Sequence, residues 1–295
     1  MNSYILPLLN GYEKLTFKEI KKVTDEIGVS VYPKVRIADV LKIKDSGLSN
    51  DEYTYSLKAH FDFVICNSDD RPEFSVEFDG PMHIKDKQQK NDALKNKICQ
   101  QFNYPLLRVN TNHVSKKYRN DFTLLAWIIY VYYLELAFNE AQKKKLIPYD
   151  EPFDPFGVVI GGMGDITSKF PYWLSVDARI KIQHLAQTHK IKDMTSSGLI
   201  GYDSKDQLRG IEFIRVNNEL GIYVESAMRH QNFPGMFVDL FSEILFVQLF
   251  EKVENYLKTG RNLENLNIIY TKVEKYQSNL QLAISHSFSS APDHD

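Results

Sequence analysis

The sequence predicts an α/β fold for its first half and an α+β fold for its second half, on the basis of three observations. Residues 58–66 and 74–79 alternate apolar and polar side chains around a run of turn-forming residues, which is typical of two antiparallel strands. Residues 86–102 are rich in helix-forming residues and contain few helix breakers. In the second half, residues 210–229 have the pattern of a hairpin that turns at Asn217-Asn218, and residues 237–257 have the spacing of a long amphipathic helix.

The two predicted strands of the first half bring acidic side chains together. Asp62 shares a strand face with His60, and Glu77 shares a face of the next strand with Asp79. A turn centred on residues 69–70 would place Asp62 directly opposite Glu77. A register shift of two residues would still leave both acids on one face of the sheet.

Adjacent carboxylates repel each other, and a divalent cation relieves that repulsion. Mg²⁺ prefers oxygen ligands, which are usually one or two carboxylates, water molecules and phosphate oxygens of a substrate. A metal held in this way can activate water and orient a phosphodiester. The competing interpretation is a solvated hairpin face whose acids contact only water. Both interpretations are compatible with the strand pattern alone.

The predicted helix favours the first interpretation. Asp86 is a candidate N-cap, and Gln88, Asp92, Lys95 and Cys99 follow one stripe along the helix. A lysine that borders the buried stripe can reach the acids of the hairpin. Residues 81–119 contain nine Lys or Arg residues against two acids, although the whole chain has a net charge of −2. Such a local basic patch suits a phosphate backbone, although a solvated charged face would have the same composition.

Several segments in this order carry a resemblance to a known superfamily. The segments are AHFDFVIC, FSVEFDGPMH, DALKNKIC and YPLLRV, preceded by VYPKVRIADVL at residues 31–41. Together they resemble the PD-(D/E)XK restriction-endonuclease-like superfamily and, within it, the domain-of-unknown-function 2726 family. The resemblance extends over roughly residues 10–115.

The resemblance implies a restriction-endonuclease-like core, in which helices flank a mixed central sheet in the order helix, three strands, helix and strand. It implies Asp62 and Glu77 as acids that hold Mg²⁺ or Mn²⁺, with the backbone carbonyl of Phe78 as a further ligand. An acid on the first helix commonly assists in this superfamily. Glu19 is the expected residue here, and Glu13 is the alternative.

The chain departs from the superfamily pattern where the motif lysine should stand, because that position holds Asp79. Lys95 on the following helix could replace the lysine and stabilise the transition state. Alternatively, Asp79 joins the metal ligands and His83 acts as a general base. A third possibility is that the site has lost activity and only binds nucleic acid. His60 could line the site but is not assigned a role.

The resemblance implies a metal-dependent endonuclease that hydrolyses phosphodiester bonds, with DNA a more plausible substrate than RNA. The residues expected to contact nucleic acid lie at the start of the basic helix: Lys85, Lys87, Gln88, Lys90 and Asp92. Family analogy suggests the effector of a bacterial anti-phage defence system, acting as a homodimer or with a partner protein. The alternative is a catalytically silent module of the same fold that binds nucleic acid or a protein.

The prolines of residues 147–157 indicate a domain boundary. We therefore expect a nuclease-like domain at 1–146, an α+β domain of unknown role at 147–287, and a disordered tail at 288–295. Residues 122–138 form an apolar stretch that is too short for a typical membrane span, so we expect a buried helix that closes the first domain or forms a dimer interface.

The remaining motifs are weak. The 295 residues contain two cysteines and no secretory leader, which favours the cytoplasm and excludes a paired-cysteine zinc site. The spacing of His184 and His189 does not fit two ligands on one helix face. The glycine-rich residues 157–164 lack the Lys-Ser/Thr pair of a phosphate-binding loop, so a turn is the better interpretation.

Overall fold

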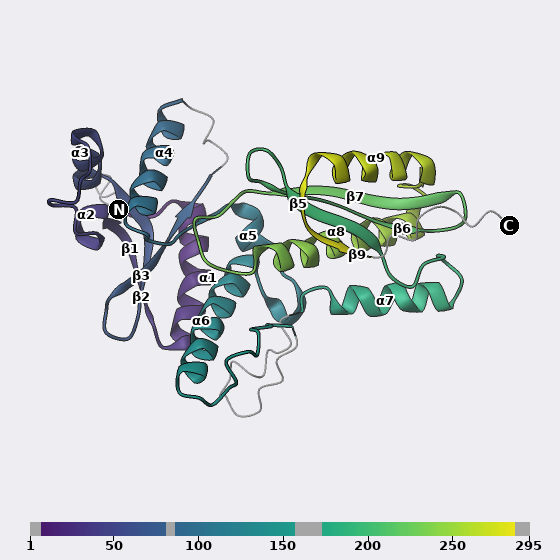
Figure 1. Ribbon diagram of the computed structural model, residues 1–295, viewed down its shortest axis with the longest axis horizontal. Helices are drawn as coiled ribbons and strands as arrows, with labels where there is room; N and C mark the ends of the chain where they lie inside the picture. The colour runs from purple at the N-terminus through teal and green to yellow at the C-terminus, as the bar shows by residue number, and fades with distance from the viewer. Residues whose placement is uncertain (1–6, 81–85, 157–172, 287–295) are drawn as a thin grey trace. The chain divides into compact units, whose positions relative to one another are not determined.

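The computed structural model of the chain describes residues 7–80, 86–156 and 173–286 (Figure 1). The chain divides into two compact units. The first unit comprises Met1–Tyr172 together with Gln231–Gly235, and the second comprises Trp173–His230 and Met236–Asp295. The boundary expected at residues 146–147 lies inside the first unit. The glycine-rich residues 157–164 and the tail at 288–295 lie outside the described residues.

The first unit contains the expected helix, three strands, helix and strand in that order, but two helices, at residues 37–40 and 50–58, are inserted between the first and second strands. Its elements are α1 (Gly11–Ile27), β1 (Ser30–Arg36), α2 (Ile37–Val40), α3 (Asn50–Lys58), β2 (His60–Cys66), β3 (Pro72–Phe78), α4 (Asp86–Gln101), β4 (Leu106–Val109), α5 (Thr111–Ser115), the 3₁₀ turn η1 (Arg119–Asp121) and α6 (Leu124–Lys143). Helix α1 begins at a capping box, in which Asn10 accepts the amide of Glu13 and Glu13 accepts the amide of Asn10.

The described strands of the first unit form a mixed sheet in the order β1-β2-β3-β4. Strands β1, β2 and β3 are antiparallel neighbours, whereas β4 runs parallel to β3 after the crossover through α4. Helices flank this sheet, as the sequence predicts (Figure 1). The segment Gln231–Gly235 lies beside β4, where Asn232 and Leu106 form an isolated antiparallel bridge.

Apolar packing fixes the sheet between helices. Phe61, Ile98 and Leu106 belong to one buried cluster that joins β2, α4 and β4. Helix α1 stacks its Phe17 ring on Phe63 of β2, with 5.9 Å between the ring centroids. Both strands that carry the acids are therefore packed within the unit, and the fully solvated hairpin face considered above is wrong.

Helix α6 accounts for the apolar stretch at residues 122–138. Thr123 caps it by accepting the amide of Ala126, and residues 124–131 are all buried. It packs against α1 and α5. Within the described parts of the chain, no helix is both long and apolar enough to cross a membrane.

The second unit is built on an antiparallel sheet in the order β8-β7-β6-β5-β9. Its elements are α7 (Val176–Gln187), β5 (Ser197–Tyr202), β6 (Leu208–Arg215), β7 (Leu220–Met228), α8 (Phe237–Thr259), β8 (Glu264–Asn265), α9 (Leu266–Asn279) and β9 (Gln281–His286). The predicted hairpin is confirmed as β6 and β7, and the predicted long helix is confirmed as α8.

Helices cover both faces of this second sheet. Helix α8 packs on one face, where Phe241 and Leu245 meet Ile200 and Ile222. Helix α9 packs on the other face, where its residues Leu266, Ile269 and Val273 meet Leu199, Ile211 and Phe213. The unit is therefore an α+β arrangement of three layers.

Candidate active site

Asp62 and Glu77 face each other across β2 and β3. The ladder pairs Phe63 with Val76, and the next antiparallel position along it puts Asp62 opposite Glu77, which confirms the predicted register. The amide of Asp62 donates to Glu77 Oε1 at 3.1 Å, and the amide of Phe78 donates to Asp62 Oδ2 at 2.9 Å. These reciprocal bonds hold both carboxylates at one place on the sheet.

Lys95 reaches this acid pair from α4. Its Nζ lies 2.6 Å from Glu77 Oε2 and donates to the carbonyl of His60 at 2.8 Å. The Lys95 side chain is 9% exposed and that of Glu77 is 7% exposed, so the ion pair is buried. The predicted helical stripe explains this position, because Cys99, one turn further along α4, is also buried.

The surroundings of Glu77 change its protonation. Burial raises the pKa of Glu77 to about 7; Lys95 opposes this shift and the nearby Asp62 carboxylate adds to it. A carboxyl group with a pKa near neutrality can exchange a proton at physiological pH. Glu77 thus has the chemistry of a proton acceptor or of a cation ligand.

Lys34 on β1 is a site residue that the sequence analysis missed. Its Nζ lies 2.6 Å from Asp62 Oδ1 and 2.7 Å from Glu13 Oε1, so one ammonium group bridges two carboxylates. Lys34 has φ of 55°, in the left-handed region, between the ladder pairs that Pro33 and Val35 form with β2. The signal in the sequence was a lysine that follows a proline within the predicted entry strand.

The structure separates the two acids considered on the first helix. Glu13 lies at the start of α1 and joins the site through Lys34. Glu19 lies elsewhere, where its carboxylate accepts from Lys117 at 2.9 Å and from Thr123 at 3.4 Å. Tyr12, beside Glu13, stacks on Phe78 with 5.6 Å between the ring centroids, which anchors the start of α1 to the end of β3.

Asp79 is engaged by Arg108, a second residue whose role was missed. The Arg108 Nη1 lies 2.8 Å from Asp79 Oδ1 and 3.2 Å from Asp92 Oδ1, and its Nε donates to Asn96 Oδ1 at 3.0 Å. The Arg108 side chain is 5% exposed. This buried arginine ties β3, β4 and α4 together behind the acid pair.

The other residues expected at the site are placed as follows. His60 has an exposed side chain and contributes its backbone carbonyl to Lys95. Lys90 is exposed on α4. His83 and Lys85 lie outside the described residues, as do the side chains of Lys87 and Gln88. The nucleic-acid contacts expected of this segment stay predictions, and so does the role of the Phe78 carbonyl as a ligand.

The donor set of the site is compatible with a hard cation. Asp62 and Glu77 offer carboxylate oxygens side by side, and one or two carboxylates with water suffice for Mg²⁺. All four of their oxygens already accept from the protein: from Lys34, from Lys95 and from two backbone amides. Among the described residues, no group of three or more His, Cys, Asp or Glu side chains is arranged to hold a metal.

Comparison with known proteins concerns the first unit. Residues 5–125 match the model of a family described as "Protein of unknown function (DUF2726)", in agreement with the resemblance seen in the sequence. The match runs from before α1 to the start of α6 and includes Asp62, Glu77 and Lys95. Searches of curated proteins and of solved structures found no match to the chain.

Proposed function

We propose that the first unit is a divalent-metal-dependent nuclease with a PD-(D/E)XK restriction-endonuclease-like core. The observation that carries the proposal is the buried contact of Lys95 with Glu77, directly beside Asp62 on the neighbouring strand. Two opposed carboxylates with a buried lysine are the groups that metal-assisted phosphodiester hydrolysis requires. The mixed order of β1 to β4 further supports the proposal.

In this proposal Asp62 and Glu77 hold Mg²⁺ or Mn²⁺, with the Phe78 carbonyl as a further ligand. The metal supplies a Lewis acid that lowers the pKa of a bound water and neutralises charge on the phosphate. Lys95 favours the ionised form of Glu77 and orients its carboxylate, because its ammonium lies 2.6 Å from Oε2. The overall reaction adds water across one P–O bond, which leaves a phosphate on one product and a hydroxyl on the other.

The position of Lys95 also favours one explanation of the missing motif lysine. A lysine on α4 supplies the positive charge that the strand position of Asp79 lacks. Asp79 itself has a different partner, because it accepts from the buried Arg108. We therefore assign Lys95 the role of the motif lysine and Asp79 a supporting role. A role for His83 stays a prediction.

Further parts of the proposal rest on charge and on family analogy. The basic excess of residues 81–119 supports a nucleic-acid substrate, and DNA is the more plausible one. Anti-phage defence in the cytoplasm, with a homodimer or a partner protein, is the proposed context. We also propose, by the same family analogy, that the second unit serves recognition, oligomerisation or sensing.

One observation favours the second candidate, a catalytically silent module that binds nucleic acid or a protein. The carboxylate oxygens of Asp62 and Glu77 are all occupied by protein donors, and Lys34 lies where a cation would neutralise Asp62. Such a site is stable without metal. The two candidates differ in whether a divalent cation displaces Lys34 from Asp62.

Cleavage assays on the full chain separate the candidates. Supercoiled plasmid, linear duplex DNA, single-stranded DNA and RNA are each incubated with Mg²⁺, Mn²⁺ or EDTA. Wild type is compared with Asp62→Asn, Glu77→Gln and Lys95→Met, and with the surface variant Glu140→Gln, whose residue lies exposed on α6. Circular dichroism checks that each variant is folded.

The nuclease proposal expects cleavage that needs the metal, persists in Glu140→Gln and falls at least about 100-fold in both acid variants. Cleavage that is equal in wild type and Asp62→Asn would refute the assigned site. An absence of cleavage on all substrates, together with retained gel-shift binding, would support the silent module.

A further inference from the structure

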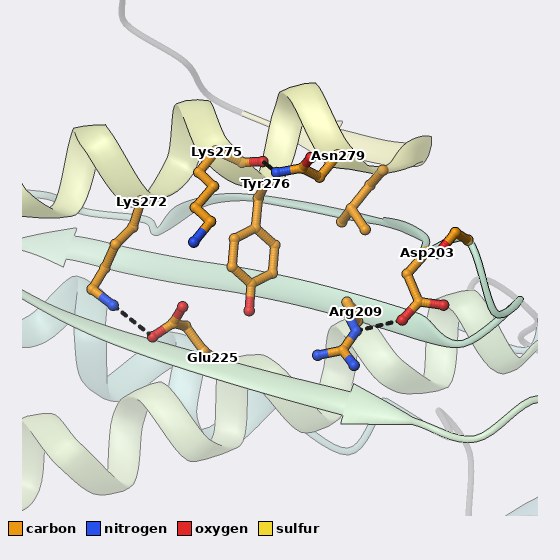
Figure 2. A pocket seen from close by; sticks show the side chains of 9 residues that line it. Asp203, Arg209, Glu225, Lys272, Lys275, Tyr276 and Asn279 are labelled. Atoms are coloured by element: carbon orange, nitrogen blue, oxygen red, sulfur yellow. Dashed lines mark hydrogen bonds and ion pairs between the residues drawn. The ribbon is translucent and has the colours of Figure 1, made fainter.

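The second unit contains a polar cavity of about 570 Å³ between α9 and the sheet (Figure 2). This volume lies within the range of small-ligand sites, which is about 300–1,000 Å³. Seven of its lining residues carry the polar or charged groups that bear on ligand binding: Asp203, Arg209, Glu225, Lys272, Lys275, Tyr276 and Asn279. The cavity lies wholly within the second unit and contains none of the residues of the candidate active site.

The cavity forms where the apolar layer beneath α9 ends. Ile211 and Phe213 of β6 pack against α9, and the next residue on the same strand face, two positions before Ile211, is Arg209. On the neighbouring strand, Glu225 occupies the same face, because it pairs with Ile211 in the ladder. On α9, the aromatic ring of Tyr276 points toward the sheet between these charges (Figure 2). Tyr276 also packs against this apolar cluster, but packing alone does not require an arginine and a glutamate at its edge.

Ion pairs hold the cationic side chains in place. Arg209 Nε lies 2.6 Å from Asp203 Oδ2, and Lys272 Nζ lies 3.1 Å from Glu225 Oε2. Asp203 in turn accepts the amides of Lys205 and Gln207 in the turn between β5 and β6. Arg209 and these backbone amides lower the pKa of Asp203 to about 2, so this carboxylate stays ionised and keeps Arg209 oriented.

The charges that line the cavity do not cancel. Arg209 and Lys272 each have an acidic partner, whereas Lys275 has no ion-pair partner among the residues that the structure describes. Its side chain extends from α9 into the space between Lys272 and Tyr276 (Figure 2). The lining therefore presents one net positive charge with three cationic groups around one aromatic ring, an arrangement that attracts an anion.

We propose that this cavity binds a nucleoside monophosphate. The phosphoryl group would lie on Lys275 and Lys272, because ammonium groups are strong partners of phosphate oxygens. The flat face of Tyr276 would stack on the base, which contributes binding energy for any base. Glu225 accepts hydrogen bonds, which matches ribose hydroxyls and base amino groups. The Asn279 Nδ2 donates to the carbonyl of Lys275 at 2.7 Å, so its side chain offers chiefly the carbonyl oxygen, as an acceptor.

Isothermal titration calorimetry on the full chain tests the proposal. The probes are AMP, GMP, CMP and UMP, compared with adenosine, ribose 5-phosphate and inorganic phosphate. All titrations contain EDTA and use the Glu77→Gln variant, so that binding at the candidate active site does not contribute. The variants Lys275→Gln, Tyr276→Ala and Tyr276→Phe are added, with Lys258→Gln on α8 as the matched lysine control.

The proposal expects at least one monophosphate to bind at least about tenfold more tightly than its nucleoside or ribose 5-phosphate. Lys275→Gln and Tyr276→Ala should each weaken that binding by about tenfold, whereas Tyr276→Phe and Lys258→Gln should not change it. The proposal is overturned if no monophosphate binds, if ribose 5-phosphate binds equally well, or if Lys275→Gln and Tyr276→Ala leave affinity unchanged. Because the readout is binding in the Glu77→Gln background, these outcomes do not depend on nuclease activity.

Discussion

The ammonium of Lys95 lies 2.6 Å from the carboxylate of Glu77, and both side chains are buried. The two residues come from different elements, since Lys95 belongs to α4 and Glu77 to β3. Ionised groups in such surroundings are stable only while their partner remains, because each lone charge bears a large desolvation cost. The pair thus couples the position of α4 to the acids of the sheet, and its removal has consequences for stability as well as for the proposed activity.

The first prediction concerns this coupling. Lys95→Met should lower the free energy of unfolding by about 3 kcal/mol at pH 8, since the buried Glu77 must then either carry its charge without a partner or take up a proton at a cost. Glu77→Gln should cost less, and the double variant should be more stable than the sum of the two single changes predicts. Urea denaturation at pH 8 measures the free energy of unfolding of wild type, the two single variants and the double variant. If the losses of the two single variants add up to that of the double variant, Lys95 and Glu77 are not coupled.

The second prediction concerns pH. Burial raises the pKa of Glu77 from 4.5 to about 7, so the folded protein binds this proton more tightly than the unfolded chain does. Between these two values the folded state holds more protons, and the free energy of unfolding must fall as the pH rises. Between pH 4.5 and about 7, Glu77 should lower the free energy of unfolding by up to about 3 kcal/mol. Denaturation from pH 4 to 8 should show that contribution in wild type and its absence in Glu77→Gln.

His113 provides a control, because it should change the free energy of unfolding with pH in the direction opposite to Glu77. Burial lowers the pKa of His113 from 6.5 to about 4, so the unfolded chain binds its proton more tightly. His113 therefore makes stability rise with pH between these values. His113→Asn should make the fall of stability between pH 4.5 and 6.5 steeper than in wild type. If His113→Asn makes this fall of stability shallower, the pKa shifts assigned to Glu77 and His113 are wrong.

The third prediction separates Asp79 from Asp62 and Glu77, the two acids of the proposed catalytic site. Because Asp79 accepts from Arg108, Asp79→Asn should keep most of any metal-dependent cleavage, while Asp62→Asn and Glu77→Gln abolish it. Arg108→Met should be the more destabilising change, by about 3 kcal/mol, because it leaves the carboxylates of Asp79 and Asp92 without their shared buried cation. Initial cleavage rates and thermal unfolding check both statements. Equal loss of activity in Asp79→Asn and Asp62→Asn would restore Asp79 to the metal ligands.

The parts of the site that the sequence predicted are those determined by local periodicity. The turn residues between β2 and β3 predicted the pairing of Asp62 with Glu77, although the ladder also contains an irregularity between Ile65 and Cys66 that the sequence did not indicate. The helical stripe through Asp92 and Cys99 placed Lys95 toward the acids. Both inferences need only neighbouring residues, because strand alternation and helix pitch repeat over a few positions.

The parts that were missed depend on backbone geometry or on distant segments. The left-handed φ of Lys34 turns its side chain toward Glu13 and Asp62, and lysine gives no local signal for that conformation. Glu13 and Glu19 are six residues apart, so they point to different sides of α1, and only the packing of that helix decides between them. In the second unit, β9 pairs with β5 across about eighty residues of sequence, a contact that no local pattern predicts.

The last prediction concerns Lys34 as an internal counter-ion. Its ammonium lies between Glu13 and Asp62, so it neutralises one of the two carboxylates that would hold the proposed metal. Lys34→Asn suits the left-handed backbone but removes the charge, so the two carboxylates lose their shared cation. Without divalent metal, this variant should lose about 1 kcal/mol of stability. Mg²⁺ should then raise its melting temperature more than it raises that of wild type, because no ammonium competes for Asp62.

The matched control for this experiment is Lys21→Gln, which removes a lysine from the exposed ion pair with Asp25 on the same helix that carries Glu13. Its melting temperature should respond to Mg²⁺ as that of wild type does. A double variant, Lys34→Asn with Asp62→Asn, should lose the extra response, because one of the carboxylates that gain from the cation is gone. If Mg²⁺ instead shifts wild type and Lys34→Asn equally, Lys34 does not occupy the cation position. If Mg²⁺ shifts neither protein, the silent binding module is the better description of the site.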